Sequence, residues 1–383
     1  MRSFRVSKYI FSIGKFKFYD AVLVHSGFIT DLLPHCSPTS VVSFEPGNRE
    51  IFLQPRFLWH LVRLMQRHSR QAASLGAYVR SVNAKAVIAY DNIPALYDWA
   101  STLPMPMIVV QHGMRQLEPM KQNIAQTSNV VFLSWGKLQV DEFASGLTAR
   151  YPNSSHQRKP EQIVPIGSLR DSMYRQVRKE VNRNPNQLCL VSQFKGLDGH
   201  GLTLPRERQV NLDKTAEFTH RYAIERNMQV LIALYSDTPQ ALQAEKNWFT
   251  DKFEGTCIFN QPSEDFATYK ATDESIISLG VHTSVLWEVF GRGGRILACN
   301  FTGDSIFKFP IPGPWYLENG SYEDFATRLD ALRAFSDAEY SNTCGDLPTY
   351  LISYDPTRPT TQAISDTISS FVNGTDWWAQ TDI

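Results

Sequence analysis

A histidine and a glycine directly follow one of the apolar runs of the chain, MIVVQ at 107–111. Short runs rich in Val and Ile are typical of strands that are buried on both faces of a parallel sheet. The residues after Gly113 favour a helix, so His112 stands where a strand turns into a helix. Ligands bind beyond this end of a parallel strand, where histidine can act as a general base or hold a phosphate and glycine leaves room. A histidine that only caps or packs at the strand end fits the position equally well.

A second candidate site follows the apolar run SIISLG at 275–280. Thr283 and Ser284 open a helix there, and Glu288 lies one turn further along on the same face as Ser284. Hydroxyl and N–H groups at a helix N-terminus suit a diphosphate, and a carboxylate one turn inward suits the hydroxyls of a ribose. The alternative is an ordinary N-cap followed by a glutamate without a special role.

Several common cofactor and metal signatures are missing from the sequence. No GxGxxG motif follows an expected strand, and GRGGR at 291–295 lies between a helix and a strand, which is the wrong context. The sequence also has no P-loop, DxD pair, HExxH zinc motif or GxSxG nucleophile elbow. We therefore expect no cofactor and no metal site, with a diphosphate that is held by the protein alone.

The elements that position these residues alternate between short apolar runs and helical patterns. The first series of expected strands comprises 21–26, 40–45, 84–90, 107–111, 129–135 and a last strand near 163–167. The second series comprises 188–194, 229–236, 256–261, 275–280 and 294–300. A polar stretch rich in Pro and Asn separates the two series. The sequence therefore predicts two α/β halves of about 180 residues joined by a linker near 175–187.

The stretch 55–82 has apolar residues at helical spacing and predicts a helical segment. Its other face carries four arginines, namely Arg56, Arg63, Arg67 and Arg70. A charged helix face is usually solvated, and the alternative is a docking surface for an anionic acceptor or a membrane. The N-terminus carries five Lys or Arg residues before the first acid, Asp20. We interpret it as a solvated start to the first strand, with peripheral membrane contact as the alternative.

Length and composition limit the class of protein. The chain has 383 residues, 43% of them hydrophobic and 20% charged, which is enough for two ordinary globular cores. A formal net charge of zero argues against a broad basic surface for nucleic acid. The five cysteines are scattered without a CxxC pair, which indicates a reducing compartment. Because no apolar run is long enough to span a membrane and no signal-peptide pattern is present, we expect a cytoplasmic protein.

Three segments, in this order, resemble a known family: VVQHG at 109–113, SNVVFLSWGKLQVDEF at 128–143 and IVPIGSLRDSMY at 163–174. They are similar to CDP-glycerol glycerophosphotransferases and capsule polysaccharide transferases, in which an HG motif precedes a strand, a short helix and a GxxRxD element. HTSVLWEVFGRGGRIL at 282–297 resembles the donor domain of bacterial surface-carbohydrate biosynthesis proteins. The likeness covers roughly residues 105–335.

This resemblance implies the GT-B fold, an α/β architecture of two Rossmann-like domains with parallel sheets that face each other across a cleft. The N-terminal acceptor domain would span 1–178, and the C-terminal nucleotide-sugar donor domain would span 186–355. Residues 356–383 would form a C-terminal helix or tail, and we consider that it crosses back to the N-terminal domain.

The resemblance also implies roles for residues of the first half. His112 would be the catalytic base that deprotonates the acceptor hydroxyl. Asp91, at the end of the preceding strand, is the alternative base, a group that orients the acceptor, or a helix cap. Gly113 and Gly167, the latter in the GxxRxD element, would lie on the acceptor or phosphate side. Arg115 is either a cation that stabilises the leaving group or a surface residue.

The roles that the resemblance implies for the second half concern the donor. Thr283 and Ser284 would hold the donor phosphates, and Glu288 would bind the ribose. His282 is either a further phosphate contact or a packed histidine at a strand end. Ser192 and Gln193, at the end of the first strand of this half, would face the cleft.

The function expected from these features is a metal-independent glycosyltransferase that builds a bacterial surface polysaccharide. Its partners would be a nucleotide-sugar and a saccharide or lipid-linked saccharide, without nucleic acid. Alternatives on the same fold are a polyol-phosphate transferase of the CDP-glycerol type, a sugar-nucleotide 2-epimerase and a pyruvyl transferase. A non-catalytic carbohydrate-binding or assembly subunit is the alternative from another class. The sequence leaves open the sugar, the nucleotide, the acceptor, the stereochemical outcome and the oligomeric state.

Overall fold

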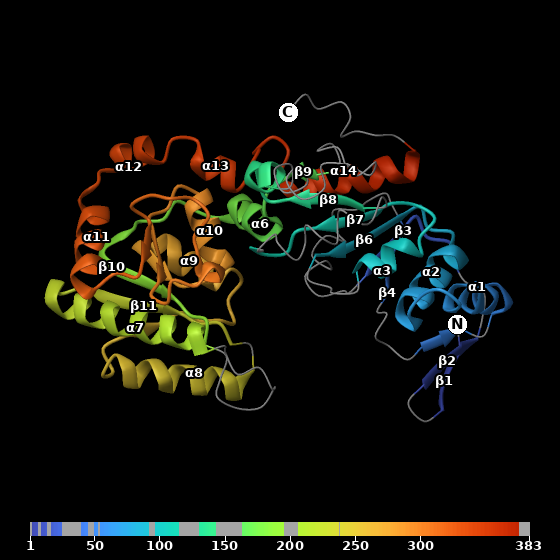
Figure 1. Ribbon diagram of the computed structural model, residues 1–383, viewed down its shortest axis with the longest axis horizontal. Coiled ribbons are helices and arrows are strands. Elements are labelled where there is room, and N and C mark those ends of the chain that lie inside the picture. Colours follow the sequence, from blue (N-terminus) through green and yellow to red (C-terminus); the bar gives the residue numbers. More distant parts are fainter. Residues whose placement is uncertain are drawn as a thin grey trace. The chain divides into compact units, whose positions relative to one another are not determined.

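The chain forms two compact units, which Figure 1 colours along the sequence. Unit 1 contains Met1–Met173 and Ile352–Ile383, and unit 2 contains Tyr174–Leu351. The computed structural model describes residues 2–6, 9–13, 17–24, 40–44, 50–52, 54–91, 96–114, 130–142, 163–194, 206–236 and 238–374. Unit 1 is therefore discontinuous in the sequence, because its last segment follows all of unit 2.

Unit 1 is built on a six-stranded sheet with the order β4-β3-β6-β7-β8-β9, in which every pair of neighbours is parallel. The strands are β3 (Ala21–Val24), β4 (Val41–Phe44), β6 (Ala86–Tyr90), β7 (Met107–Val110), β8 (Val130–Ser134) and β9 (Ile163–Pro165). All six fall within or directly beside the apolar runs that predict them. Numbered along this unit, the order is 2-1-3-4-5-6, so the direction of winding reverses once, between β3 and β6. In open parallel sheets ligands bind beyond the carboxyl ends of the strands.

The central strands of unit 1 are buried on both faces, with alternate residues in separate cores. Val22, Val87 and Val109 belong to the core on one face, with residues of helices α1 (Pro55–Met65) and α2 (Arg70–Val82). Leu23 and Ile88 belong to the core on the other face, with residues of helix α14 (Thr360–Asn373). Burial on both faces explains why these strands read as continuous apolar runs rather than as alternating patterns.

The helical stretch 55–82 is interrupted, so α1 and α2 are separate helices. Ser69 is the N-cap of α2, and its hydroxyl accepts a hydrogen bond from the backbone N–H of Ala72 at 3.3 Å. The Ser69 hydroxyl also donates to the carboxylate of Asp98, which lies in the short helix α3 (Leu96–Ser101). An N-cap serine starts a new helix by satisfying a free backbone N–H group. The chain therefore breaks between α1 and α2, although the apolar spacing continues across the break.

The interpretation of the basic N-terminus as the start of the first parallel strand is wrong. The strands β1 (Arg2–Val6) and β2 (Tyr9–Ile13) form an antiparallel hairpin, and β5 (Glu50–Phe52) pairs with β2 in parallel. These three strands make a sheet of their own, separate from the six-stranded sheet. The Arg and Lys residues among the aromatic residues conceal the short strands from a search for continuous apolar runs.

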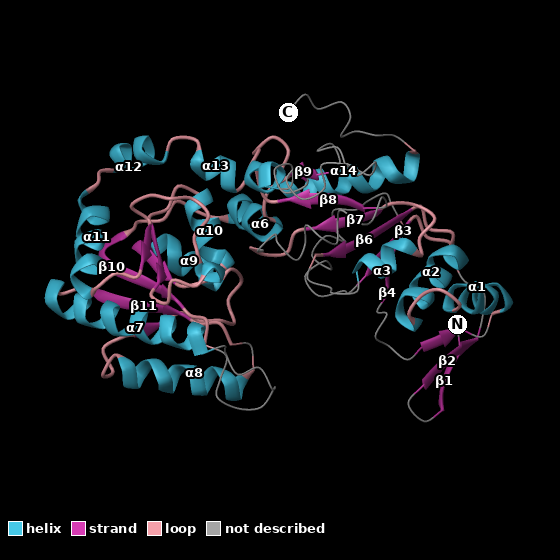
Figure 2. Cartoon of the chain, in the orientation of Figure 1, coloured by secondary structure: helices cyan, strands magenta, loops and turns pink. Residues whose placement is uncertain are grey.

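Unit 2 also has a six-stranded parallel sheet, with the order β12-β11-β10-β13-β14-β15. Its strands are β10 (Asn184–Val191), β11 (Gln229–Ala233), β12 (Ile258–Phe259), β13 (Ser275–Gly280), β14 (Ile296–Asn300) and β15 (Tyr316–Glu318). Figure 2 shows these strands in magenta among the helices that surround them. The edge strand β15 has three residues and was not expected from the sequence.

The helices of unit 2 follow the strands in the usual α/β alternation. They are α7 (Arg206–Arg226), α8 (Pro239–Lys252), α9 (Ala267–Glu274), α10 (Ser284–Gly291), α11 (Tyr322–Ala334), α12 (Asp337–Cys344) and α13 (Leu347–Leu351). The helix α6 (Leu169–Val177) carries the chain from unit 1 into unit 2. Within the described residues, no helix is long and apolar enough to cross a membrane.

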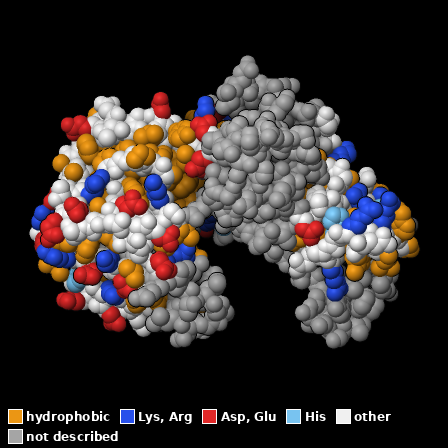
Figure 3. Space-filling model, viewed as in Figure 1, with side chains coloured by type: hydrophobic (Ala, Val, Ile, Leu, Met, Phe, Trp, Pro, Cys, Tyr) orange, Lys and Arg blue, Asp and Glu red, His pale blue; other side chains and the backbone are white. Residues whose placement is uncertain are grey.

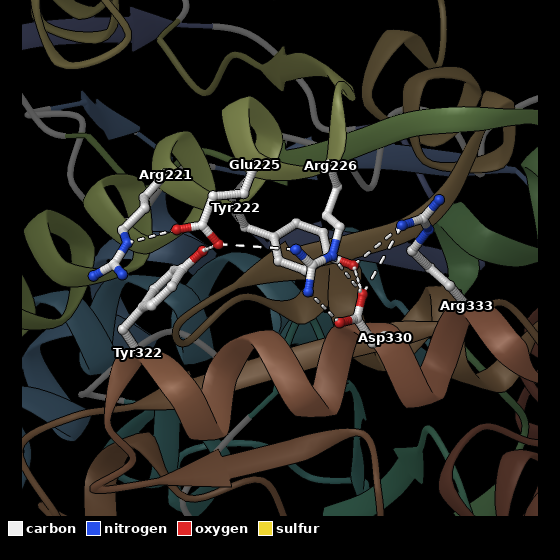
Figure 4. A network of polar contacts seen from close by, with 7 residues as sticks. All are labelled: Arg221, Tyr222, Glu225, Arg226, Tyr322, Asp330 and Arg333. Atoms are coloured by element: carbon white, nitrogen blue, oxygen red, sulfur yellow. Dashed lines mark hydrogen bonds and ion pairs between the residues drawn. The ribbon is translucent and has the colours of Figure 1, made fainter.

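Helices α7 and α11 are joined by a network of charged and phenolic side chains, drawn in Figure 4. The guanidinium of Arg226 pairs with the carboxylate of Asp330 at 2.8 Å, and the Tyr222 hydroxyl donates to the same carboxylate at 2.7 Å. The Tyr322 hydroxyl donates to Glu225, and the Arg221 guanidinium lies 3.7 Å from the centroid of the Tyr322 ring. This network fixes how α11 lies along α7.

Candidate functional site

The strand order of unit 2 directs attention to one point on its sheet. Numbered along this unit, the order is 3-2-1-4-5-6, so the direction of winding reverses between β10 and β13. In open parallel sheets a nucleotide binds beyond the carboxyl ends of the strands at this reversal. Gln193 follows β10 and His282 follows β13, and the side-chain amide of Gln193 donates to the backbone carbonyl of His282. The structure therefore brings these two predicted residues together.

Ser192 is held by a buried carboxylate. Its hydroxyl donates to Glu245 of α8, and the backbone N–H groups of Tyr235 and Ser236 donate to the two oxygens of Glu245, each at 2.9 Å. The Ser192 oxygen also accepts from the backbone N–H of Phe194 at 3.1 Å. Glu245 is fully buried and thus fixes the loops after β10 and β11. Ser192 therefore lies at the carboxyl end of β10, and its hydroxyl is already bonded to Glu245 and Phe194.

His282 and Arg208 lie close enough to influence each other electrostatically. Burial lowers the pKa of His282 to about 4, and the positive charge of Arg208 acts in the same direction. The imidazole is therefore neutral at pH 7 and packs edge-on against the Phe307 ring, with 5.7 Å between ring centroids. Arg208 stands in the first turn of α7, so its guanidinium adds a full positive charge to a helix N-terminus.

Two polar atoms in this region have no hydrogen-bond partner among the described residues. They are the side-chain oxygen of Gln193 and Nε of Arg208, and both are shielded from solvent. Buried polar atoms of folded proteins are nearly always paired, so an unpaired donor on a cation is a natural contact for an anion. The sequence analysis missed Arg208. Its signal was its place in the first helix after the first strand of the second series.

The predicted helix start after β13 forms as expected. Thr283 is the N-cap of α10, and its hydroxyl accepts from the backbone N–H of Val285 at 3.3 Å. Ser284 is the first helical residue. Glu288 lies one turn further along, is 3% exposed, and accepts a hydrogen bond from the hydroxyl of Tyr269 at 2.9 Å. The carboxylate is thus oriented by a phenol from α9.

Tyr269 is itself held by a cation. The guanidinium of Arg292 lies 5.1 Å from the centroid of the Tyr269 ring and 5.3 Å from that of Tyr174. Arg292 also donates to the carboxylate of Asp273 at 3.2 Å, and Tyr174 donates to the same carboxylate at 3.0 Å. These contacts hold Tyr269, the residue that donates to Glu288, and were not predicted from the sequence. It makes the position of the Glu288 carboxylate depend on α6, α9 and α10 together.

In unit 1, Asp91 and His112 are neighbours at the carboxyl ends of β6 and β7. The carboxylate of Asp91 accepts a hydrogen bond from the backbone N–H of His112 at 2.9 Å. The imidazole ring is half-buried and lies beside the ring of Tyr90, with 4.9 Å between the centroids. Asp91 therefore fixes the backbone that carries His112, and the imidazole is partly open to solvent.

The turn after β7 is held by Gln111. Its side-chain amide donates to the carbonyl of Gly113 at 3.0 Å, and its side-chain oxygen accepts from the backbone N–H of Trp135 at 2.8 Å. The indole of Trp135 donates to the carbonyl of Gln111 at 3.0 Å. Gly113 is buried in this turn. In the QHG motif, Gln111 thus anchors the turn and His112 presents a titratable imidazole.

Gly167 lies in a site of close packing. Its backbone has a φ of +92°, and a Cβ there would stand 2.2 Å from the carbonyl oxygen of Ser353 and 2.9 Å from the hydroxyl of Thr360. The chain returning from unit 2 needs this space. Arg115 lies outside the described residues. No group of three or more His, Cys, Asp or Glu side chains suited to a metal was found in the part of the chain that is described.

Comparison with known proteins gives structural matches only. No protein-family model matches the chain, and no curated protein matches it in sequence. A structure of the wall teichoic acid polymerase TagF, as its H444N variant, matches with a TM-score of 0.53 at 12% identity, over 94% of this chain and 90% of that chain. An S. aureus MnaA–UDP structure matches with a TM-score of 0.56 at 10% identity, over 93% and 97% of the respective chains.

A third match is a structure titled as a putative UDP-N-acetylglucosamine 2-epimerase from Listeria monocytogenes. Its TM-score is 0.57 at 11% identity, and the match covers 95% of this chain and 98% of that chain. The activities named for these neighbours are those of a wall teichoic acid polymerase and of a putative UDP-N-acetylglucosamine 2-epimerase. At such low identity the likeness establishes architecture alone. The two parallel six-stranded sheets with their surrounding helices, together with these neighbours, give this chain the two-domain GT-B fold.

Proposed function

We propose that this protein is a glycosyltransferase that moves a sugar from a nucleotide-activated donor to a hydroxyl of a saccharide or lipid-linked saccharide. The observation that carries the proposal is the cluster at the strand reversal of unit 2. There Arg208, Gln193 and the N-terminus of α10 meet a neutral His282, with Glu288 one helical turn away. A cation, backbone N–H groups and a carboxylate in this order fit a nucleoside diphosphate.

The donor phosphates would be held by Arg208 and by the N–H groups at the start of α10. Because the Nε of Arg208 has no partner among the described residues, a phosphate oxygen would satisfy it without displacing another bond. The Glu288 carboxylate, which the hydroxyl of Tyr269 orients, would accept from ribose hydroxyls. The same groups would stabilise the negative charge that develops on the leaving diphosphate, and we propose that no metal is required.

The acceptor hydroxyl would be deprotonated by His112. The carboxylate of Asp91 is engaged with the backbone N–H of His112, which favours a positioning role for Asp91 and leaves the imidazole as the base. Polyol-phosphate transfer from a CDP-activated donor is the second candidate. It is supported by the order of the QHG, Trp-containing and GSLRD segments, which resembles the glycerophosphotransferases.

The first test is binding of nucleotides to the purified protein. We expect one of UDP, CDP, GDP, CMP and ADP to raise Tm, since saturation at a hundred times Kd stabilises by about 2.7 kcal/mol. Glu288→Ala should abolish this shift, whereas Glu180→Ala, at an exposed position of the same unit, should preserve it. UDP would favour glycosyl transfer and CDP polyol-phosphate transfer. The absence of a shift with every nucleotide would contradict the donor site.

The second test separates chemistry from binding. His112→Asn should reduce turnover of the matching donor with a saccharide acceptor by about 10²- to 10⁴-fold, because it removes the general base. It should leave the nucleotide-induced Tm shift unchanged, since the donor site belongs to unit 2. EDTA should leave turnover of the wild-type protein unchanged. Release of an epimerised nucleotide-sugar without an acceptor would show instead that the enzyme is an epimerase.

A further inference from the structure

The helix α1 exposes large apolar side chains in a row. Trp59, Val62 and Met65 are 57%, 62% and 49% exposed, whereas Phe57 on the opposite face is buried in the core of unit 1. Leu58 and Leu61 pack against the same core. Since α1 is already anchored by its inner face, the outer row is an additional apolar surface that the fold itself does not need. Scattered exposed apolar residues are common, but three on one helix of eleven residues form a patch.

Arginines border this row on one side. Successive residues of a helix are rotated by about 100°, which places Arg56 and Arg63 together, next to Trp59 and away from Met65. Arg67 follows in the turn after α1. The guanidinium of Arg63 lies 5.4 Å from the centroid of the Trp59 ring. Figure 3 shows Lys and Arg side chains beside hydrophobic ones on the surface that α1 and α2 form. The outer surface of α1 is therefore half apolar and half cationic.

Carboxylates are missing from this part of the chain. Residues 51–90 contain six Lys or Arg and no Asp or Glu, although the whole chain has equal numbers of basic and acidic residues. Asp98, which approaches the loop after α1, is bonded to Ser69 and lies 3.3 Å from the imidazole of His68. Burial lowers the pKa of His60, and the charges of Arg80, Arg56 and Arg63 act in the same direction. The cationic field of α1 is thus not neutralised by its own sequence neighbours.

The strand β5 leads into α1 after two residues and pairs with β2 of the N-terminal hairpin. The sequence of that hairpin region adds five Lys or Arg before the first acid at Asp20.

We propose that α1 is an interfacial helix that docks unit 1 on a bilayer with anionic lipid headgroups. Trp59, Val62 and Met65 would enter the boundary between headgroups and acyl chains, while Arg56, Arg63 and Arg67 would pair with lipid phosphates. A helix with an apolar stripe containing Trp and a flank rich in Arg has the chemistry of such helices. The surface is independent of the donor site and would keep a lipid-linked acceptor within reach of unit 1.

The test is co-sedimentation of the full chain with vesicles. Wild-type protein should bind vesicles of phosphatidylcholine with about 30% phosphatidylglycerol far better than phosphatidylcholine alone, and 0.5 M NaCl should weaken this binding. Val62→Ser should weaken binding about fivefold and Trp59→Ala about tenfold. Ile224→Ser is the matched control, because Ile224 is 64% exposed on α7 of unit 2 and its substitution should have no effect.

Charge is tested separately. Arg63→Glu should weaken binding to the anionic vesicles about 25-fold, since each elementary charge near such a surface contributes about fivefold. Lys179→Glu, at an exposed position of unit 2, should change it little. Each variant should keep the wild-type Tm, because only exposed side chains change. Failure of the wild type to bind anionic vesicles, or equal binding by the Val62 and Ile224 variants, would overturn the proposal. Loss of a dimer on Val62→Ser would assign the surface to a second copy instead.

Discussion

His282 shows how the surroundings of a single side chain set its protonation state. Its imidazole is kept neutral by burial and by the nearby charge of Arg208, and its backbone carbonyl accepts from Gln193. A neutral imidazole can donate a hydrogen bond to a phosphate without adding a charge that the buried site would have to solvate. The sequence left two interpretations open, a phosphate contact and a packed histidine. The contact with Phe307 and the neighbouring Arg208 are compatible with both.

This environment makes stability depend on pH in a defined direction. Because the pKa of His282 is about 4 when folded and 6.5 as its ordinary value, the unfolded chain binds the proton first. Stability should therefore be complete above about pH 6.5 and fall as the pH drops towards 4, by on the order of 3 kcal/mol. His282→Gln should flatten urea-unfolding free energies between pH 6.5 and 4.5. The difference in unfolding free energy between this variant and the wild type at pH 7.5 gives the cost of the substitution itself. An equal dependence of the unfolding free energy on pH in both proteins would contradict the lowered pKa of His282.

At the scale of elements, Glu245 fastens three pieces of unit 2 to one another. Its carboxylate lies on α8 and receives bonds from the end of β10, through Ser192, and from the loop after β11, through Tyr235 and Ser236. These are the strand ends beside the proposed donor site. A buried carboxylate satisfied by three donors holds these loops in place.

Glu245→Gln should destabilise the protein by about 2–4 kcal/mol, because a side-chain amide has one acceptor oxygen and leaves a buried backbone N–H unpaired. Chemical denaturation measures this loss. Gln243→Ala, which removes an exposed bond to Asn247 on the same helix, should cost less than about 0.5 kcal/mol. A Glu245 variant no less stable than the Gln243 variant would show that the carboxylate is dispensable.

The elements that apolar runs predict most directly are the central strands, which are buried on both faces. The central strands of both sheets are confirmed, because a strand covered by helices on each side must be apolar throughout. The strands β5 and β15 have three residues each and lie at sheet edges, where no continuous apolar run is needed. The break between α1 and α2 depends on a hydroxyl bond of Ser69, which apolar spacing does not record.

The candidate site was predicted unevenly for a related reason. Thr283, Ser284 and His112 stand directly at strand or helix ends, so their place follows from local pattern. Arg208, Glu245 and Tyr269 act through contacts with residues far away in the sequence, such as Tyr269 with Glu288. Only the fold brings such partners together, and a single sequence carries no record of these pairs.

At the scale of the whole molecule, the main feature is that unit 1 is completed by the end of the chain. Ala363, Ile364 and Ile368 of α14 are buried in the core formed with β3, β6 and β7. The hydroxyl of Thr360 donates to the carbonyl of Ile166 at 2.7 Å, and the backbone N–H of Ser353 donates to the carbonyl of Trp135 at 2.8 Å. The helix thus covers one face of the sheet that carries His112.

Ile364→Ala should weaken unit 1 by about 2–4 kcal/mol, since it removes a fully buried side chain from this core. Hydrogen exchange of peptides from β6 and β7 should accelerate, while exchange of peptides from β10 and β11 should stay as in the wild type. Gln362→Ala, at an exposed position on the same helix, should leave both regions unchanged. Equal acceleration in the two units would mean that they unfold as one.

The discontinuity of unit 1 also has a consequence for the order of events during synthesis. The ribosome makes β9 about 190 residues before α14, an interval of roughly 10–40 s at 5–20 residues per second. Throughout that time Leu23, Ile88 and their neighbours on one sheet face lack their final cover, while unit 2 is being synthesised. The unit made first is therefore the one that finishes folding last, and its uncovered face is where a nascent-chain chaperone would be needed.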